Sequence, residues 1–479
     1  MTESTVSLFE KLVQADPPDD VPVLFDTACV IGGSIAGLLA ARVLSDRARR
    51  VVVIEPDDIS TETGSRPGVP QDQQVHTLLP AGQLWVERWM PGITEEAQDR
   101  GASFVPDKGV TAINGVPQAP DGEGRHLLAI GRPLLETLIR NRVTAMDNVS
   151  VLRGQATGLQ YRDEAVSAVR YVPTDGGDQG DRGAAVLDAD FVVDAMGRSS
   201  RLSNWLRQSG YDQPRLERVE APINYATALF ERPVKVADLE KVGALALFAP
   251  QYPSSGVSVA AAQPIEDEQW IVMLMGYGDS RPGRTIGEFR QACTKLPSVF
   301  TTATAGAAIG DVVTYRQAES RRRHFAEVGR FPARLVSVGD AVASFNPIYG
   351  QGMSSAALHA SCLASYLGGG PDLDTAAREF FRLQQVVVDA AWAVSAGGDA
   401  ARLDAQNGTE VPDEVREQRW AMEQITAATL FDGEVTRAFN NVSYMLRHPA
   451  TLADPELLAR AVAAAEGAMA DLADTTIDR

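Results

Sequence analysis

Residues 28–56 of the chain read ACVIGGSIAGLLAARVLSDRARRVVVIEP, and their pattern is the strongest indication of the fold. A short apolar run ends at Ile31, a glycine-rich turn follows, and the next segment has the Ala/Leu-rich pattern of a helix. A second apolar run ends in Glu55, about 20 residues beyond the first glycine of the turn. This order of strand, tight turn, helix, strand and acidic residue is typical of a dinucleotide-binding βαβ unit.

The residue types in the turn suit that role. Gly32 permits a sharp turn, and Gly37 allows the helix to pack closely against the strand. Backbone amides at the start of the helix would bind a pyrophosphate, while Glu55 would accept hydrogen bonds from a ribose hydroxyl. Ser34 occupies the position of the middle glycine of the usual motif and is small enough to let a ligand approach the backbone.

The composition of the 479 residues restricts the possible partners. A net charge of −19 and the near absence of basic runs, apart from residues 321–323, argue against a nucleic-acid partner. The three cysteines, Cys29, Cys293 and Cys362, are far apart and predict neither a metal site nor a disulfide framework, which favours a cytoplasmic protein. No apolar run is long enough to predict a membrane span.

Two later segments resemble strand ends that face a ligand. The run at 191–193 is followed by a turn at Met196 and Gly197, where a parallel sheet would present its carboxyl edge. A second buried run, 334–338, ends in Gly339 and Asp340, whose carboxylate could bind sugar-like hydroxyls. The loop that follows leads into a helix starting near residue 353, whose N-terminus can hold partial negative charge.

Two arginines are candidates for the same site. Arg66 lies near the start of the Pro- and Gly-containing loop that opens residues 65–93, and from there it could reach the pyrophosphate. Arg132 is among the first residues of an amphipathic helix at 131–143, and we expect it to approach the cofactor.

The chain divides into four parts on composition and pattern. Residues 215–315 alternate or run apolar with Pro and Gly between the runs, which predicts an antiparallel sheet forming a wall of a substrate cavity. The aromatic residues Phe230, Phe248, Tyr252, Trp270 and Tyr277 are candidates for lining it. The predicted parts are a discontinuous nucleotide-binding domain at 26–214 and 316–370, the inserted sheet domain at 215–315, a helical region at 371–479 and an N-terminal extension at 1–25.

Three segments together carry a family resemblance: VIGGSIAGL with Glu55, DAMGRSSRL, and VGDAVASFNPIYGQGMSSAALHA. The chain resembles the group A flavoprotein monooxygenases, the class typified by para-hydroxybenzoate hydroxylase. The RPGVPQ loop and the NPIYGQGM motif are similar to a bacterial branch that includes polyether epoxidases and the dialkyldecalin [4+2] cyclase of pyrroindomycin biosynthesis. The resemblance implies an α/β fold in which a Rossmann-like FAD-binding domain of the glutathione reductase type carries the inserted antiparallel sheet and is followed by the helical region.

The resemblance also implies roles for individual residues. Glu55 would bind the adenosine ribose, the glycine turn the pyrophosphate, Arg132 the adenosine or ribityl side, and Asp340 the ribityl chain. The loop that begins at Pro347 would lie against the flavin ring. The predicted cofactor-binding residues are Gly32, Gly33, Ser34, Ala36, Gly37, Glu55, Arg66, Arg132, Met196, Gly197, Gly339, Asp340, Pro347, Gly350, Gln351, Gly352 and Met353.

Two reactions remain open at this point. In the first, NADPH or NADH reduces FAD, and a flavin C4a-hydroperoxide formed with dioxygen epoxidises or hydroxylates a hydrophobic polyketide, polyene or terpenoid intermediate of secondary metabolism. In the second, a non-redox cyclase folds a linear polyene for [4+2] cycloaddition, with FAD as a structural wall. Met196, Gln73 and Gln74 depart from the monooxygenase pattern and favour the second. A flavin reductase, a halogenase and a non-catalytic flavin-binding protein are lesser alternatives, and the sequence singles out no catalytic side chain.

Overall fold

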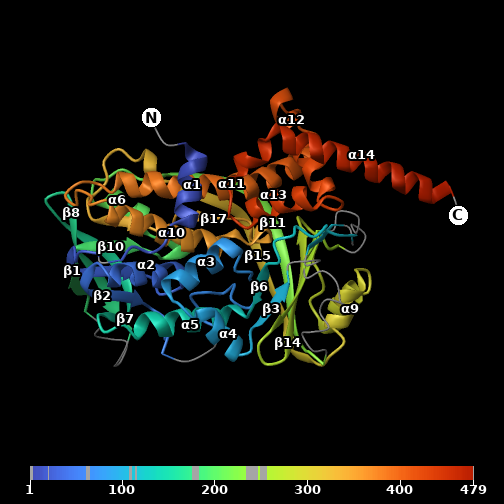
Figure 1. Cartoon of the computed structure of the whole chain (residues 1–479). Helices are drawn as coiled ribbons and strands as arrows, with labels where there is room; N and C mark the ends of the chain where they lie inside the picture. The colour runs from blue at the N-terminus through green and yellow to red at the C-terminus, as the bar shows by residue number, and fades with distance from the viewer. Residues whose placement is uncertain are drawn as a thin grey trace.

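A computed structural model gives the arrangement of the chain (Figure 1). It describes residues 4–19, 21–60, 65–106, 111–113, 116–174, 183–233, 246–248 and 256–477. Two large sheets lie side by side in this part of the chain, and helices cover them (Figure 1). The α/β class predicted from the sequence is confirmed.

The first sheet belongs to the nucleotide-binding half and has the order β16-β10-β1-β2-β7-β8-β9. The strands from β16 to β7 run parallel, and β8 and β9 continue the sheet antiparallel. Ile31 pairs with both Ile54 and Asp194, and Asp194 pairs with Ser337, so the carboxyl ends of four strands meet at one edge. The strands are β1 (Phe25–Ile31), β2 (Ala48–Glu55), β7 (Val149–Arg162), β8 (Ala165–Pro173), β9 (Ala185–Asp188), β10 (Phe191–Asp194) and β16 (Leu335–Ser337).

Helices pack against this sheet and against one another. The long helix α10 (Gln351–Gly368) contacts α2 (Ile35–Ser45) and α3 (Pro80–Trp89), and α5 (Arg132–Thr144) contacts α2. The N-terminal extension contributes α1 (Thr5–Gln14), which packs on α10 because its apolar side chains, including Phe9, are buried there. Shorter helices in the same half are α4 (Ile93–Asp99), α6 (Leu202–Gln208), η1 (Gly197–Ser199), η4 (Phe325–Glu327), η5 (Gly339–Ala341) and η6 (Pro347–Tyr349).

The second sheet has the order β17-β15-β11-β14-β13-β12-β4-β5. It is antiparallel as predicted, except that β12 pairs parallel with β4, a strand from the nucleotide-binding half of the sequence. The boundary predicted at residue 315 falls inside β15. The strands of this sheet are β4 (Thr111–Ile113), β5 (Val116–Pro117), β11 (Arg215–Glu231), β12 (Ala246–Phe248), β13 (Val259–Ile265), β14 (Gln269–Tyr277), β15 (Ala308–His324) and β17 (Ala343–Ser344). A separate two-stranded sheet consists of β3 (Ser103–Pro106) and β6 (His126–Ala129). The helices that accompany the second sheet are α8 (Ile286–Cys293) and α9 (Ser298–Ala303).

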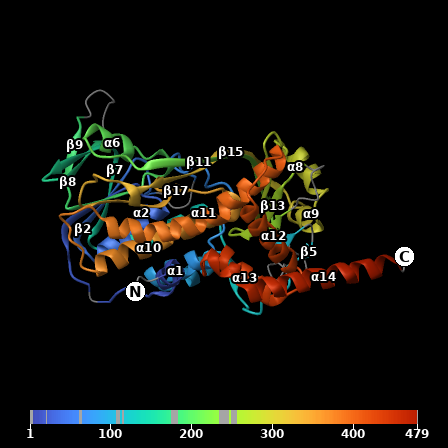
Figure 2. The same ribbon diagram turned by 90° about the horizontal axis from the view of Figure 1, so that it is seen from above.

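The C-terminal region is helical, as predicted. Helix α11 (Arg378–Asn407) runs alongside α10 and also contacts β11 of the second sheet (Figure 2). Helix α14 (Pro455–Ile477) extends away from the rest of the molecule (Figures 1 and 2). The remaining elements are α12 (Asp413–Ala428), α13 (Gly433–Ser443) and η7 (Pro449–Ala453).

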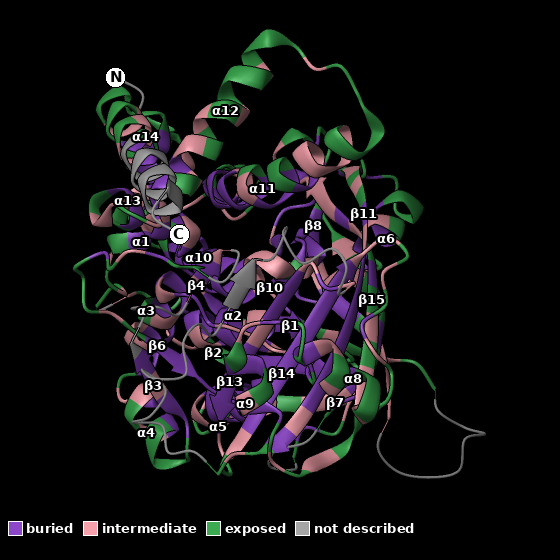
Figure 3. Ribbon diagram, turned by 90° about the vertical axis from the view of Figure 1, so that its right-hand side faces the viewer, coloured by how far each residue is buried: buried purple, intermediate pink, exposed green. Residues whose placement is uncertain are grey.

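Burial follows these layers. Strands β1 and β10 of the first sheet, β13 and β14 of the second sheet, and α10 are largely buried, whereas α12 exposes most of its surface (Figure 3). Among the helices that the structure describes, none combines the length and the apolar character that crossing a bilayer requires.

Candidate functional site

The glycine turn after β1 is packed so tightly that two of its glycines are required. Gly32 has a φ of +110°, and a Cβ there would lie 2.4 Å from the carbonyl oxygen of Ala195. A Cβ on Gly37 would lie 1.8 Å from the carbonyl oxygen of Gly32. Any side chain at these positions would therefore push α2 away from β1 and β10, as the sequence motif predicts.

Glu55 ends β2 and holds this turn from the side. Its Oε2 accepts a hydrogen bond of 2.6 Å from the backbone N–H of Gly33, and its Oε1 accepts one of 3.0 Å from the N–H of Asp57. Burial raises the pKa of Glu55, while the two amides and the nearby Arg66 oppose that shift. The carboxylate thus lies at the predicted place beside the turn.

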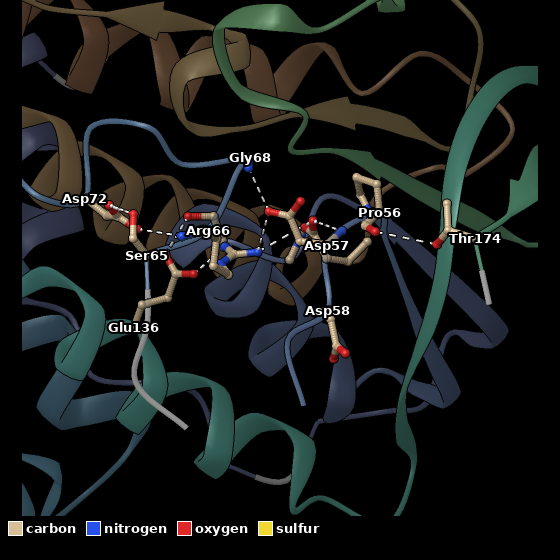
Figure 4. Close-up of polar contacts among 12 residues, drawn as sticks. Pro56, Asp57, Asp58, Ser65, Arg66, Gly68, Asp72, Glu136 and Thr174 are labelled. Carbon is tan, nitrogen blue, oxygen red and sulfur yellow. Dashed lines mark hydrogen bonds and ion pairs between the residues drawn. The ribbon is translucent and has the colours of Figure 1, made fainter. Parts of the chain in front are cut away.

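Arg66 reaches the turn from the loop after β2 (Figure 4). Its Nη1 lies 3.5 Å from both Glu55 Oε1 and Asp57 Oδ2, and its Nη2 donates to Glu136 Oε1. The backbone N–H of Arg66 donates to Asp72 Oδ2 at 2.9 Å, which fixes the loop. The guanidinium is 9% exposed and is surrounded by carboxylates.

Glu136 joins the two arginines at the start of α2. Its Oε2 accepts hydrogen bonds from Ser34 Oγ at 2.8 Å and from Arg132 Nη2 at 3.2 Å. Burial raises the pKa of Glu136, but Arg132, Arg66 and Ser34 outweigh that effect and leave the pKa lowered. The Nε of Arg132 is buried and lacks a hydrogen-bond partner among the described residues, so it can still receive an anion.

The end of β10 is fixed by a buried acid. Asp194 accepts hydrogen bonds from Ser200 Oγ at 2.7 Å, Ser337 Oγ at 3.0 Å and the Met196 N–H at 3.1 Å. Burial raises its pKa against these three bonds. Met196 and Gly197, which has a φ of +65°, are thereby held at the carboxyl edge of the sheet beside the Gly32 turn.

Gly339 and Asp340 complete this edge. Gly339 has a φ of +62°, and a Cβ there would lie 2.5 Å from the Cβ of Ala36, so these two small residues let the turn approach α2. The half-buried carboxylate of Asp340 makes no hydrogen bond or ion pair with the residues that the structure describes. Burial raises its pKa, and Arg198, Arg132 and Arg321 oppose that shift.

The loop from Pro347 leads into α10. Gly350 has a φ of +66°, and no side chain caps the first turn of the helix, which begins at Gln351. The Oε1 of Gln351 is buried and lacks a partner in the part of the chain that is described, and a Cβ on Gly352 would meet nothing within 4 Å. Free amides and open space at this helix start suit an electron-rich ligand atom.

These features fit FAD. An unpaired carboxylate at Asp340, an unpartnered guanidinium nitrogen at Arg132 and two glycine-cradled helix starts are the donors and acceptors that sugar hydroxyls and a pyrophosphate require. Direct contacts link the turn at 32–37, Glu55, Arg66, Arg132 and Gly339. The loop at 347–353 does not take part in these contacts. It lies at the N-terminus of α10, where a Cβ on Gly350 would lie 3.4 Å from the side chain of Leu79. Binding of FAD by each of these residues remains a prediction.

Sequence reasoning missed three residues of this site: Asp57, Glu136 and His359. Glu136 follows Arg132 by four residues on a helix, and that spacing is a recognisable signal for an ion pair. Asp57 directly follows the motif strand, which is a weaker signal. No pattern in the sequence indicates His359, which supports Gly339 from inside α10. Groups of side chains suited to a metal ion are absent from the described ranges.

Three comparisons place the chain among known proteins. Residues 26–369 match the family model described as an FAD binding domain. Protein Rv3254 of Mycobacterium tuberculosis (strain ATCC 25618 / H37Rv) is 35% identical over 348 residues, which are 71% of this chain and 72% of that protein.

Solved structures share the fold at low identity. The structure of p-nitrophenol 4-monooxygenase PnpA from Pseudomonas putida DLL-E4 has a TM-score of 0.56 and 19% identity. The match covers 91% of this chain and 98% of the PnpA chain. The structure of the Diels-Alderase PyrE3 of the pyrroindomycin pathway has a TM-score of 0.54 and 17% identity. The match covers 88% of this chain and 80% of the PyrE3 chain. On the match to the family model and on the identity to Protein Rv3254, the chain belongs to the FAD binding domain family and is a flavoprotein with the fold of the group A monooxygenases.

Proposed function

We propose that the protein is an FAD-dependent monooxygenase that epoxidises or hydroxylates a hydrophobic polyketide, polyene or terpenoid intermediate of secondary metabolism. NADPH or NADH would serve as the reductant and dioxygen as the co-substrate. The bound flavin would supply the redox chemistry, and the chain would bind and orient the substrate and exclude water from it.

One observation carries the proposal: an apolar and tyrosine-rich face of the second sheet packs against the loop predicted to lie by the flavin. We call this face the sheet wall. Ile348 of the loop packs against it. The wall consists of Ile223, Tyr225, Val259, Met273 and Met275, with Val75, Ala261, Tyr277 and Tyr315 packed against them. An apolar surface beside a cofactor site is what a hydrophobic substrate needs.

The aromatic candidates from the sequence divide between core and wall. Tyr277 belongs to the sheet wall, whereas Phe230 and Trp270 are fully buried in the main core. Tyr252 and the side chain of Phe248 lie outside the described residues. The wall is therefore built largely from residues that the sequence did not single out.

The cyclase alternative rests on a different observation. Gln74 is buried, and its Oε1 accepts a hydrogen bond of 2.5 Å from Thr227 Oγ1 on β11, while Gln73 is exposed and donates to Ser65 Oγ at 2.9 Å. Neither places a cation beside the cofactor site, and the side chain of Met196 is apolar. These positions favour a flavin that stays oxidised while a polyene is folded for [4+2] cycloaddition.

Anaerobic stopped-flow mixing of the FAD-loaded protein with NADPH and, separately, NADH tests the choice. For the monooxygenase, the oxidised-flavin absorbance bleaches, and admitting oxygen in the presence of a linear polyene yields a product heavier by one oxygen atom. For the cyclase, the flavin stays oxidised under every condition, and the polyene gives an isomer of unchanged mass. Bleaching without any change in the polyene would contradict the proposed substrate class but not the redox activity.

A further inference from the structure

A group of buried and half-buried polar residues lies at the end of the sheet wall, where α11 meets the loop at 346–349. We call Tyr277, Asn346, Asp399 and Arg402 the α11 cluster. Two of them come from α11, one from the end of β14 and one from the residue before Pro347. The close contact between α11 and the loop is visible at Gly398, where a Cβ would lie 2.0 Å from the hydroxyl of Tyr349.

Asp399 accepts hydrogen bonds from Asn346 in this cluster. The Nδ2 of Asn346 lies 2.8 Å from Asp399 Oδ1 and 3.1 Å from Oδ2, and it also lies 3.4 Å from the hydroxyl of Tyr277. Asp399 is completely buried. It therefore acts as the acceptor that orients Asn346 at the start of the loop.

Arg402 lies near Asp399, three residues earlier on α11, and the two charges attract each other without forming a salt bridge. Its Cζ lies 3.7 Å from the centroid of the Tyr277 ring, and its Nη1 donates to Gln406 at 3.4 Å. No carboxylate of the described residues lies within 4 Å of it, and the next acid on the helix, Asp404, is paired with Arg419 at 2.6 Å. Its Nε and Nη2 are shielded from solvent and have no hydrogen-bond partner in the described chain.

The two unpartnered nitrogens indicate which kind of ligand would suit this edge of the guanidinium. Nε and Nη2 lie on the same edge of a guanidinium, and their two parallel N–H groups match the two oxygens of a carboxylate. Leaving such buried donors unpaired is costly, so a ligand that pairs both would bind favourably. A neutral amide offers one oxygen and no charge, so it pairs with this edge more weakly than a carboxylate does.

An apolar surface begins next to this edge. Tyr277, on which Arg402 stacks, packs against the sheet wall together with Ile348, and the hydroxyl of Tyr225 in the same wall is also buried without a described partner. We propose that Arg402 binds the carboxylate of the substrate while the sheet wall holds its apolar body, so that the substrate is an amphipathic monocarboxylic acid. This inference rests on the proposed role of the sheet wall as the substrate wall.

A pair of probes that differ only in the carboxylate tests it. 4-Phenylbutanoate and 4-phenylbutanamide are titrated into the FAD-loaded protein by calorimetry, with no reductant present. We expect the wild type to bind the acid at least about tenfold more tightly than the amide, and Arg402→Gln to bring the two affinities within about twofold of each other. Arg382→Gln, an exposed arginine on the same helix, should leave the ratio unchanged.

Two outcomes would overturn the inference. One is equal binding of acid and amide by the wild type, which needs no variant, and the other is a folded, FAD-loaded Arg402→Gln protein that keeps the preference. Because the titration involves neither NADPH nor oxygen, a protein that prefers the acid but fails the stopped-flow test would contradict the proposed redox reaction alone.

Discussion

The backbone N–H of Gly339 donates a 2.9 Å hydrogen bond to Nδ1 of His359, a completely buried imidazole on α10. Nδ1 can accept this bond only when it carries no proton, and burial lowers the pKa of His359 to about 3. The turn that carries Asp340 is thus held from behind by a neutral histidine. This relationship makes the predicted FAD site sensitive to pH from inside the core.

His359→Asn should change how stability depends on pH. The folded-state pKa lies below the ordinary value of 6.5, so the stabilising effect of neutral His359 is fully present above pH 6.5 and is lost as the pH falls from 6.5 towards 3. Asparagine keeps an acceptor and cannot be protonated. The wild-type free energy of unfolding, measured in urea, should fall more steeply with decreasing pH than that of the variant, by up to about 1.4 kcal/mol per pH unit.

The exposed residue His126 supplies the control, because His126→Asn should keep the wild-type slope. Parallel pH profiles for the wild type and His359→Asn would contradict the role assigned to His359.

Gly37→Ala should prevent normal packing of α2. Its Cβ would lie 1.8 Å from the carbonyl oxygen of Gly32, which belongs to the backbone and cannot move aside easily. We expect a loss of roughly 3 kcal/mol or more in stability together with a loss of bound FAD. Thermal unfolding and the flavin-to-protein absorbance ratio measure both effects.

Gly397→Ala is the matched change on α11, where a Cβ would meet nothing within 4 Å. It should raise stability by roughly 0.4–1 kcal/mol because the helix loses a glycine. A Gly37→Ala protein as stable as this control would show that the turn can relax.

Arg66→Ala should destabilise the protein strongly. Arg66 contacts Glu55, Asp57 and Glu136, and its removal leaves buried carboxylates without their cation (Figure 4). Breaking a buried pair in this way costs about 3–5 kcal/mol, measured as the change in free energy of unfolding. Arg49→Ala removes an ion pair with Asp26 whose side chains are 75% and 86% exposed, and it should cost no more than about 1 kcal/mol. If the two variants lost similar amounts of free energy of unfolding, the Arg66 contacts would contribute little to stability.

Asp340→Ala should weaken the retention of FAD with little effect on folding, because its carboxylate has no partner among the described residues. Loss of hydrogen bonds from a ribityl chain to a carboxylate should raise the dissociation constant of FAD by about tenfold or more. Equilibrium dialysis with flavin fluorescence measures the constant. Asp374→Ala, which removes an exposed acid paired with Arg334, should not change it. Full flavin occupancy in purified Asp340→Ala would argue against the predicted FAD site.

Local patterns along the chain are enough to predict the nucleotide-binding half of the fold. The sequence predicts the turn at 32–37 because its steric demands are local. Gly32 has a positive φ, and a Cβ on Gly37 would lie 1.8 Å from the carbonyl oxygen of Gly32, so neither position accommodates a side chain. Apolar runs that end at Glu55, at Asp194 and shortly before Asp340 likewise predict a parallel sheet edge through their order along the chain.

The distant side chains that complete the site become apparent only in the folded chain. Glu136 meets Arg66 across 70 residues of sequence. Helix α11 carries no motif, yet it brings Asp399 to Asn346 and Arg402 to Tyr277. Such contacts depend on how whole helices pack against the sheets, and one sequence contains no record of that packing. The physical reason is that charge pairing acts through space, whereas turn geometry and strand patterns are set by neighbours along the chain.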